Sequence, residues 1–451
     1  MTGNWNYRVV ISILITLIYL LSLYLTTRFD YTNQFEGILM WYLVSFSLFL
    51  LIIRKIPVKY LWALLSLSLI LFLFDFPNLT VDYYRFIWDG EIATKGYSAY
   101  RNTPEQLITH FRDNNYLASL YHGMSDLSKS NPTVYTPINQ LFFRFSAFLT
   151  DDLYTAITIL RMILISSHLM TGLYLIKFLK SINRSEKLAW YYLLNPLVLQ
   201  ETIYNIHFEG MMVMFLCISF YFLVRQKWLV SSLFWSVSIN IKLLPIVLLP
   251  FIFRKVKIAV SSLIYVLITI TTLILFYLSF DKLEFGHYMD GMRLYFGVFE
   301  FNSSILELFL HYGKWKYDWN MTRIYAPYLS RITIKIILLL SLIGIPENWN
   351  GVFRRMTIAL FLYFLLSSTV HPWYLITMLF LGVISGFSSI VLWSMTIVLS
   401  YAFYDPVSKE YFETLRWIEY LPVVSLFIYE VAKGGLLIKW IDRHSEVSAC
   451  E

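Results

Sequence analysis

Residues 76–101 combine acidic, basic and aromatic side chains directly after an apolar run that ends at Phe74. If this part of the chain is helical, Asp82, Arg85 and Asp89 fall at positions i, i+3 and i+7, on one helix face. Such a face at a membrane boundary is unlike a lipid anchor and indicates the mouth of a site. A carboxylate there can accept a proton from an attacking hydroxyl, a cation can neutralise a phosphate, and aromatic rings can stack on a sugar.

Other polar residues occur where apolar runs end or break, and ionisable groups at membrane depth are functional candidates. Several also have purely structural interpretations: Asp82 as a helix cap, Arg85 and Asp89 as an ion pair, and histidines as hydrogen-bonding residues between helices. Lys242 could extend its amine towards the membrane surface. The full candidate set is Asp82, Arg85, Asp89, Tyr135, Glu201, His207, Glu209, Lys242, Asn302 and His371.

The composition predicts an all-α, polytopic integral membrane protein. Of the 451 residues, 58% are hydrophobic and only 14% are charged, which is too apolar for a soluble domain of this size. Repeated apolar runs give about 12–14 membrane segments, several of them short. The net charge of +7 comes from short loops between these runs, so the positive-inside rule explains it and no nucleic-acid partner is expected.

Loop charges predict the topology. Arg54, Lys55 and Lys59 crowd a short loop between the second and third spans, which places that loop and the N-terminus in the cytoplasm. Residues 76–137 and 281–323 then form two extracytoplasmic segments, and the C-terminus is again cytoplasmic. We expect one membrane-embedded domain over residues 1–451, in the cytoplasmic (inner) membrane.

Three apolar stretches are too short or too interrupted to cross the bilayer simply. Ile138–Leu149 covers about 18 Å as a helix, against a hydrocarbon core of about 30 Å. Asn195-Pro196 interrupts the next run, ahead of several polar residues. Basic residues flank Trp228–Phe253 at both ends, which predicts two half-length helices that meet near Lys242.

These motifs together resemble those of bacterial polyprenol-phosphate-mannose-dependent mannosyltransferases, members of the GT-C glycosyltransferase superfamily. The string from Asp82 to Gly90, Asp-Tyr-Tyr-Arg-Phe-Ile-Trp-Asp-Gly, is similar to the family's DxYRYxWDGR motif. The resemblance extends in order over residues 76–375. Its other parts are Pro132-Thr-Val-Tyr-Thr-Pro-Ile-Asn-Gln140, Asn195-Pro196, Asn205-Ile-His-Phe-Glu-Gly210, Lys242-Leu-Leu-Pro245, Phe301-Asn-Ser-Ser304 and Val370-His-Pro-Trp-Tyr374.

The resemblance implies a GT-C-type bundle with a large extracytoplasmic loop and an acidic general base in that loop. Carried over, the base is Asp82, although the residues alone do not separate it from Asp89. Arg85, Lys242 and His371 become candidates for the donor phosphate, and His207 and Glu209 for a donor or acceptor pocket. The family's Arg after Asp-Gly is Glu91 here, and the loop follows the third predicted helix, whereas many relatives have it after the first.

The predicted function is transfer of a hexose, mannose by the resemblance, from a polyprenyl-phosphate donor to a lipid or glycan acceptor on the extracytoplasmic face. The alternative is a transporter or flippase of a lipid-linked sugar, which also uses broken helices. The chain lacks an internal repeat, which disfavours transport. No Asp-X-Asp pair stands out, so neither a metal nor another cofactor is expected. The expected partners are the donor, the acceptor and membrane lipids.

Overall fold

The computed structural model describes residues 3–256, 259–344, 348–439 and 441. It is 79% helical, and the described residues form no strand, which confirms the all-α class. A parallel bridge between Phe301 and Thr369 is an isolated sheet-like contact. The chain divides into two compact units, each built from separate stretches of sequence.

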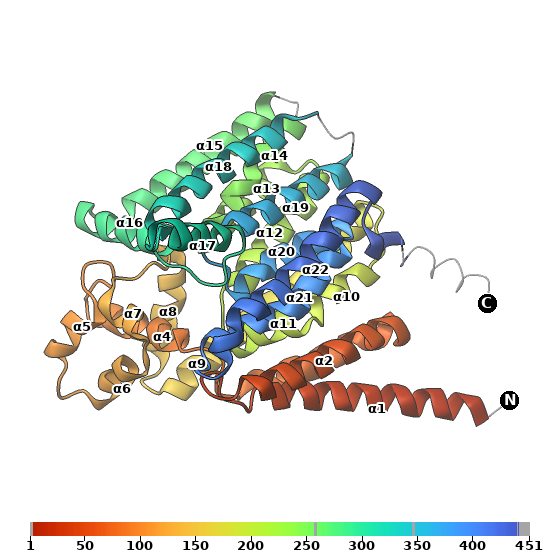
Figure 1. The fold of residues 1–451 in the computed structure, drawn as a ribbon, viewed down its shortest axis with the longest axis horizontal. Helices are drawn as coiled ribbons and strands as arrows, with labels where there is room; N and C mark the ends of the chain where they lie inside the picture. The colour runs from red at the N-terminus through yellow and green to blue at the C-terminus, as the bar shows by residue number, and fades with distance from the viewer. Residues whose placement is uncertain (1–2, 257–258, 345–347, 440, 442–451) are drawn as a thin grey trace. The chain divides into compact units, whose positions relative to one another are not determined.

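The first unit comprises Met1–Thr80, Leu164–Gly210 and Pro372–Glu451. Its first two helices run side by side, as the red ribbons of Figure 1 show. The T-shaped ring pair of Trp62 and Trp190 packs α3 on α10. The described elements of this unit are α1 (Gly3–Thr26), α2 (Phe35–Lys55), α3 (Val58–Leu73), the later part of α9 (Leu153–Ser181), α10 (Lys187–Leu193), α11 (Pro196–Val198), the π-helical turn η2 (Leu199–Tyr204), η4 (Pro372–Tyr374), α20 (Leu375–Ser385), α21 (Ser388–Thr396), η5 (Ile397–Phe403), η6 (Ser408–Tyr411) and α22 (Phe412–Lys433).

The second unit comprises Val81–Ile163 and Met211–His371. Helix α4 (Asp82–Thr94) confirms the predicted helix and packs along α8 (Pro137–Leu149). The other described elements are α5 (Pro104–Leu107), η1 (Ile108–His110), α6 (Asn115–Gly123), α7 (Asp126–Ser130), α12 (Glu209–Val224), α13 (Trp228–Ile241), η3 (Leu244–Leu248), α14 (Leu249–Lys255), α15 (Ala259–Leu278), α16 (Lys282–Gly297), α17 (Ile305–Tyr317), α18 (Thr322–Leu342) and α19 (Trp349–Leu366).

The described residues contain five helices that are long and apolar enough to cross a membrane, or six if the broken pair Pro196–Tyr204 and Glu209–Val224 is one span. Five shorter apolar helices accompany them, among them Val58–Leu73 and Trp228–Ile241. The polytopic class is therefore confirmed, and the described apolar helices include both full-length and short ones, as the predicted segments did. Proline and polar residues divide several apolar runs into pieces of 10–17 residues.

The break predicted near Lys242 is confirmed. Helix α13 ends at Ile241, Lys242 has extended backbone angles (φ −153°, ψ 135°), and Pro245 lies in the following short helix η3. A proline at the start of that helix is tolerated because its missing N–H is not needed there. The half-length helix is therefore followed by an extended lysine rather than by another turn.

The two segments predicted to be extracytoplasmic contact each other within the second unit. Ser98 Oγ donates to Glu284 Oε1 over 2.6 Å, Arg101 forms an ion pair with Asp281, and His287 Nδ1 lies 2.9 Å from the carbonyl oxygen of Tyr100. Two segments on the same side of a membrane can make such contacts. Which side this is stays a prediction.

Gly90 of α4 provides a test of how closely α4 packs against α8. A Cβ atom added there would lie 2.2 Å from the carbonyl oxygen of Phe143 on α8. Backbone cannot move aside as a side-chain end can, so we expect Gly90→Ala to lower the free energy of unfolding by about 1–3 kcal/mol. The thermal unfolding midpoint in detergent measures this. The control is Gly286→Ala on α16, where an added Cβ meets nothing within 4 Å. A midpoint equal to that of the control would contradict the close α4–α8 contact.

Candidate functional site

Asp82 is the first residue of α4 and is half-buried. A carboxylate in the first turn interacts favourably with the unpaired N–H groups and the positive end of the helix dipole. Val81, and not Asp82, occupies the N-cap position. The side chain is therefore placed at a helix start without serving as its cap.

Asp89 lies two turns further along α4 and is fully buried. Arg85 Nε donates to its Oδ1 over 2.7 Å, and Gln140 Nε2 of α8 donates to its Oδ2 over 2.8 Å. The structure therefore contains the Arg85–Asp89 ion pair that the sequence allowed. Both carboxylate oxygens accept strong hydrogen bonds, as a buried charge requires.

The guanidinium of Arg85 also anchors the outer segment. Its Nη1 donates to the carbonyl oxygens of Ser128 (2.6 Å) in α7 and of Asn131 (2.9 Å), the residue that follows this helix. Its Nη2 is buried and has no hydrogen-bond partner among the described residues. Arg85 thus has one N–H₂ group left for a ligand, so its predicted role towards the donor phosphate stays a prediction.

The first turn of α8 connects α4 to the broken helix α13. Gln140 holds Asp89, while Asn139 Nδ2 donates to the carbonyl oxygen of Ile241 over 2.9 Å and Thr136 Oγ1 reaches the same oxygen at 3.4 Å. That carbonyl belongs to the residue before Lys242. One short turn therefore fixes both the acidic face of α4 and the backbone that carries the lysine.

Tyr135 packs its ring against Phe86 and Phe143 in T-shaped contacts, at centroid distances of 4.9 and 5.5 Å. Its carbonyl oxygen accepts a hydrogen bond of 2.7 Å from the hydroxyl of Tyr100. The extended segment before α8 is therefore held at both its side chain and its backbone.

Glu91, which stands where the related motif has arginine, is buried and bonded to Lys95 over 3.2 Å. Burial raises the pKa of Glu91, although the bond with Lys95 opposes this shift. The residue that differs from the family motif is therefore a buried part of α4.

Asn302 and His371 lie beside the same sheet-like contact in the second unit. The backbone N–H of Phe301, which precedes Asn302, donates to the carbonyl oxygen of Ser368 over 3.0 Å, and the carbonyl oxygen of Phe301 accepts from the N–H of Val370 over 2.9 Å. The His371 ring stacks on Phe301 with a centroid distance of 4.4 Å. Asn302 is fully buried and has φ of 50°, a left-handed conformation that asparagine adopts more readily than most residues.

A second polar cluster surrounds Glu201 in the first unit. Its Oε1 accepts a hydrogen bond of 2.6 Å from the Tyr401 hydroxyl, and its Oε2 accepts from Asn205 Nδ2 (3.0 Å) and His207 Nδ1 (3.1 Å). A carboxylate only accepts, so Nδ1 of His207 carries its proton. The His207 ring stacks on Trp373 of η4 with a centroid distance of 4.1 Å and an interplanar angle of 20°.

The structure thus places the predicted residues in several polar clusters, and these clusters contain further residues that were not predicted. Glu209, also predicted, is buried and is the first residue of α12. Sequence reasoning did not assign roles to Thr136, Asn139 or Gln140, although the quoted motif contained them. No sequence pattern pointed to Tyr401, because it lies in an apolar run 200 residues from Glu201.

Within the described ranges, no three His, Cys, Asp or Glu side chains are placed to hold a metal ion.

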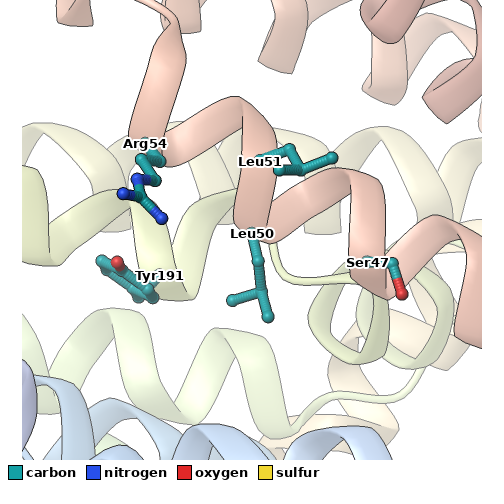
Figure 2. Close-up of a pocket in the computed structure, with 5 residues that line it drawn as sticks. All are labelled: Ser47, Leu50, Leu51, Arg54 and Tyr191. Atoms are coloured by element: carbon teal, nitrogen blue, oxygen red, sulfur yellow. The ribbon is translucent and has the colours of Figure 1, made fainter.

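A pocket of about 500 Å³ lies beside α2 in the first unit. Ser47, Leu50, Leu51 and Arg54 follow one face of that helix, and Tyr191 of α10 lies opposite (Figure 2). The Arg54 guanidinium extends towards the Tyr191 ring. None of the predicted site residues lines this pocket.

Comparison with known families decides the assignment. Residues 32–257, half of the chain, match the model of the MptA_B family, described as alpha-(1->6)-mannopyranosyltransferase, N-terminal domain. The chain belongs to this family. It is therefore a glycosyltransferase of a mannosyltransferase family, as the motifs indicated. No curated protein and no solved structure matches the chain significantly. Of the predicted site residues, Asn302 and His371 lie beyond the matched range.

The buried pair on α4 yields a stability prediction. Arg85→Met or Asp89→Asn leaves the other charge buried without its partner, which typically costs about 3–5 kcal/mol. We expect the double variant Arg85→Met/Asp89→Leu to lose much less, because no buried charge remains. Thermal unfolding of the purified variants measures this difference.

The matched control is Arg293→Met, which removes the exposed ion pair with Asp290 and should shift stability by about 1 kcal/mol or less. Single variants of Arg85 and Asp89 that are as mild as this control would contradict the structural role of the pair.

Proposed function

We propose that the protein transfers mannose from a polyprenyl-phosphate donor to a hydroxyl group of a lipid or glycan acceptor on the extracytoplasmic face of the membrane. Membership of a mannosyltransferase family and the membrane-spanning helices support this proposal. The family's description further supports an α-(1→6) linkage in the product. A single displacement inverts the anomeric centre, so an α-linked product then requires a β-linked donor.

We assign the general base to Asp82. The observation that carries this choice is the state of the other carboxylate on the same helix face: both oxygens of Asp89 are engaged, by Arg85 and by Gln140. Asp89 is also fully buried, whereas Asp82 is half-buried at the start of α4. A base must reach the acceptor hydroxyl within hydrogen-bond distance, which favours the more accessible group.

We assign the binding of the donor phosphate to cationic side chains. Departure of the carrier leaves a second negative charge on its phosphate, and a positioned cation stabilises that charge. Lys242 is half-buried at the end of a half-length helix, with its backbone fixed from α8. Arg85 retains one unengaged N–H₂ group, and His371 belongs to the same unit. No metal is needed for this scheme.

A flippase of lipid-linked sugars is the second candidate, because broken helices such as that at Lys242 occur in transporters. A transporter binds its cargo without chemical change, so the loss of a single carboxylate oxygen should change affinity more than turnover. The two functions therefore differ in their response to Asp82→Asn.

We expect Asp82→Asn to lower the rate of mannosyl transfer by about 10²–10⁴-fold, because it removes the proton acceptor but keeps the shape of the side chain. Transfer in proteoliposomes measures the rate. The control is Asp126→Asn: Asp126 is also the first residue of a helix in the same outer segment, but its side chain is fully exposed. Equal rates for the two variants, or a larger loss for Asp89→Asn in folded protein, would reject Asp82 as the base.

A further inference from the structure

The π-helical turn η2 in the first unit concentrates buried polar atoms that lack partners. Gln200 Nε2, Thr202 Oγ1 and Asn205 Oδ1 each have no hydrogen bond among the described residues. These side chains are buried, with relative exposures of 3%, 0% and 0%. Because leaving such a group buried and unpaired typically costs about 1–3 kcal/mol, three within six residues call for an explanation.

The orientation of the asparagine follows from its neighbour. Asn205 must turn its N–H₂ group to Glu201, since the carboxylate only accepts, and this leaves Oδ1 on the other side. The backbone N–H of Asn205 donates to the carbonyl oxygen of Gln200 over 2.8 Å, the i to i+5 bond of a π-turn. Gln200 and Asn205 therefore lie one turn apart on the same face.

The backbone here is also strained. Ile206 has φ of 55°, which a β-branched residue rarely adopts. π-helical turns and such outliers persist only where the surroundings enforce them, and both gather at ligand sites. The hydrogen bonds of Glu201 with Tyr401, Asn205 and His207, and the stacking of His207 on Trp373, supply that enforcement.

We propose that η2 and the residue after it bind sugar hydroxyl groups through Gln200, Thr202 and Asn205, with Glu201 and Tyr401 as positioning residues. The three unpaired atoms are a donor, a hydroxyl that both donates and accepts, and an acceptor. A phosphate only accepts, whereas sugar hydroxyls satisfy all three. This inference rests on the proposed function, and the sugar is that of the donor or of the acceptor.

Thr202→Val and Gln200→Met test the proposal, because both remove an unpaired polar atom at nearly constant shape. Removing a buried unpaired group should leave the unfolding midpoint unchanged or raise it. If the atom binds a sugar, the same variants raise KM for one substrate by about three- to tenfold, the effect of one hydrogen bond. A purely structural residue cannot give greater stability together with weaker binding.

Two controls accompany these variants. Thr377→Val removes another fully buried, unpaired hydroxyl of the first unit, on α20, and should leave both KM values unchanged. Tyr401→Phe should raise the same KM as Thr202→Val, because it removes a hydrogen bond to Glu201. Glu201 then holds the side chain of Asn205 less firmly in place. Its own control is Tyr19→Phe, which removes a buried hydrogen bond of 2.6 Å to the carbonyl oxygen of Leu194.

The substrate whose KM rises identifies the source of the sugar: the polyprenyl-phosphate donor or the acceptor. Unchanged KM values for both substrates in Thr202→Val and Gln200→Met would overturn the proposal. A parallel loss of stability and activity would also overturn it, because the atoms would then serve the fold. Absence of any transfer by the wild-type protein would instead refute the proposed function.

Discussion

The carboxylate of Asp89 is the group on which the outer part of the second unit depends. It is fully buried, so its charge must be compensated, and Arg85 and Gln140 do so from two different helices. Arg85 in turn holds the C-terminal end of α7, and the turn of α8 that provides Gln140 also binds the last carbonyl of α13. One buried charge thus aligns two helices, an irregular segment and the backbone beside Lys242.

A related constraint operates in the first unit. The chain leaves regular helix after Leu193, where Asn195 and Pro196 prevent continuation, and a π-turn follows. Backbone that is not in a regular helix is tolerated at membrane depth only where protein or a water-filled cavity satisfies it. Here Glu201 collects three donors, from its own turn and from Tyr401. In both units a buried carboxylate with several donors stabilises the irregular stretch.

Much of this was predictable from the sequence. The helix at Asp82, the short helix before Leu149 and the break at Lys242 follow from local rules: spacing, length and proline. The partner of Glu201 did not follow, because Tyr401 is distant in sequence and lies among apolar residues. Spacing placed Arg85 on the same face as both aspartates, but only packing against α8 shows that Asp89 is shared with Gln140. The sequence predicted membrane segments of which several are short, but hydropathy does not show where an apolar run bends and so which segments are full spans.

The central claim, that the protein moves mannose from a lipid carrier, is tested most directly by following labelled mannose on polyprenyl phosphate in proteoliposomes with the wild-type protein. We predict that the label leaves the carrier and appears in the acceptor as an α-(1→6)-linked residue, with the mannose donor preferred over its glucose analogue. Label that crosses the bilayer while still attached to the carrier, with no transfer to any acceptor, would contradict the account and identify a flippase.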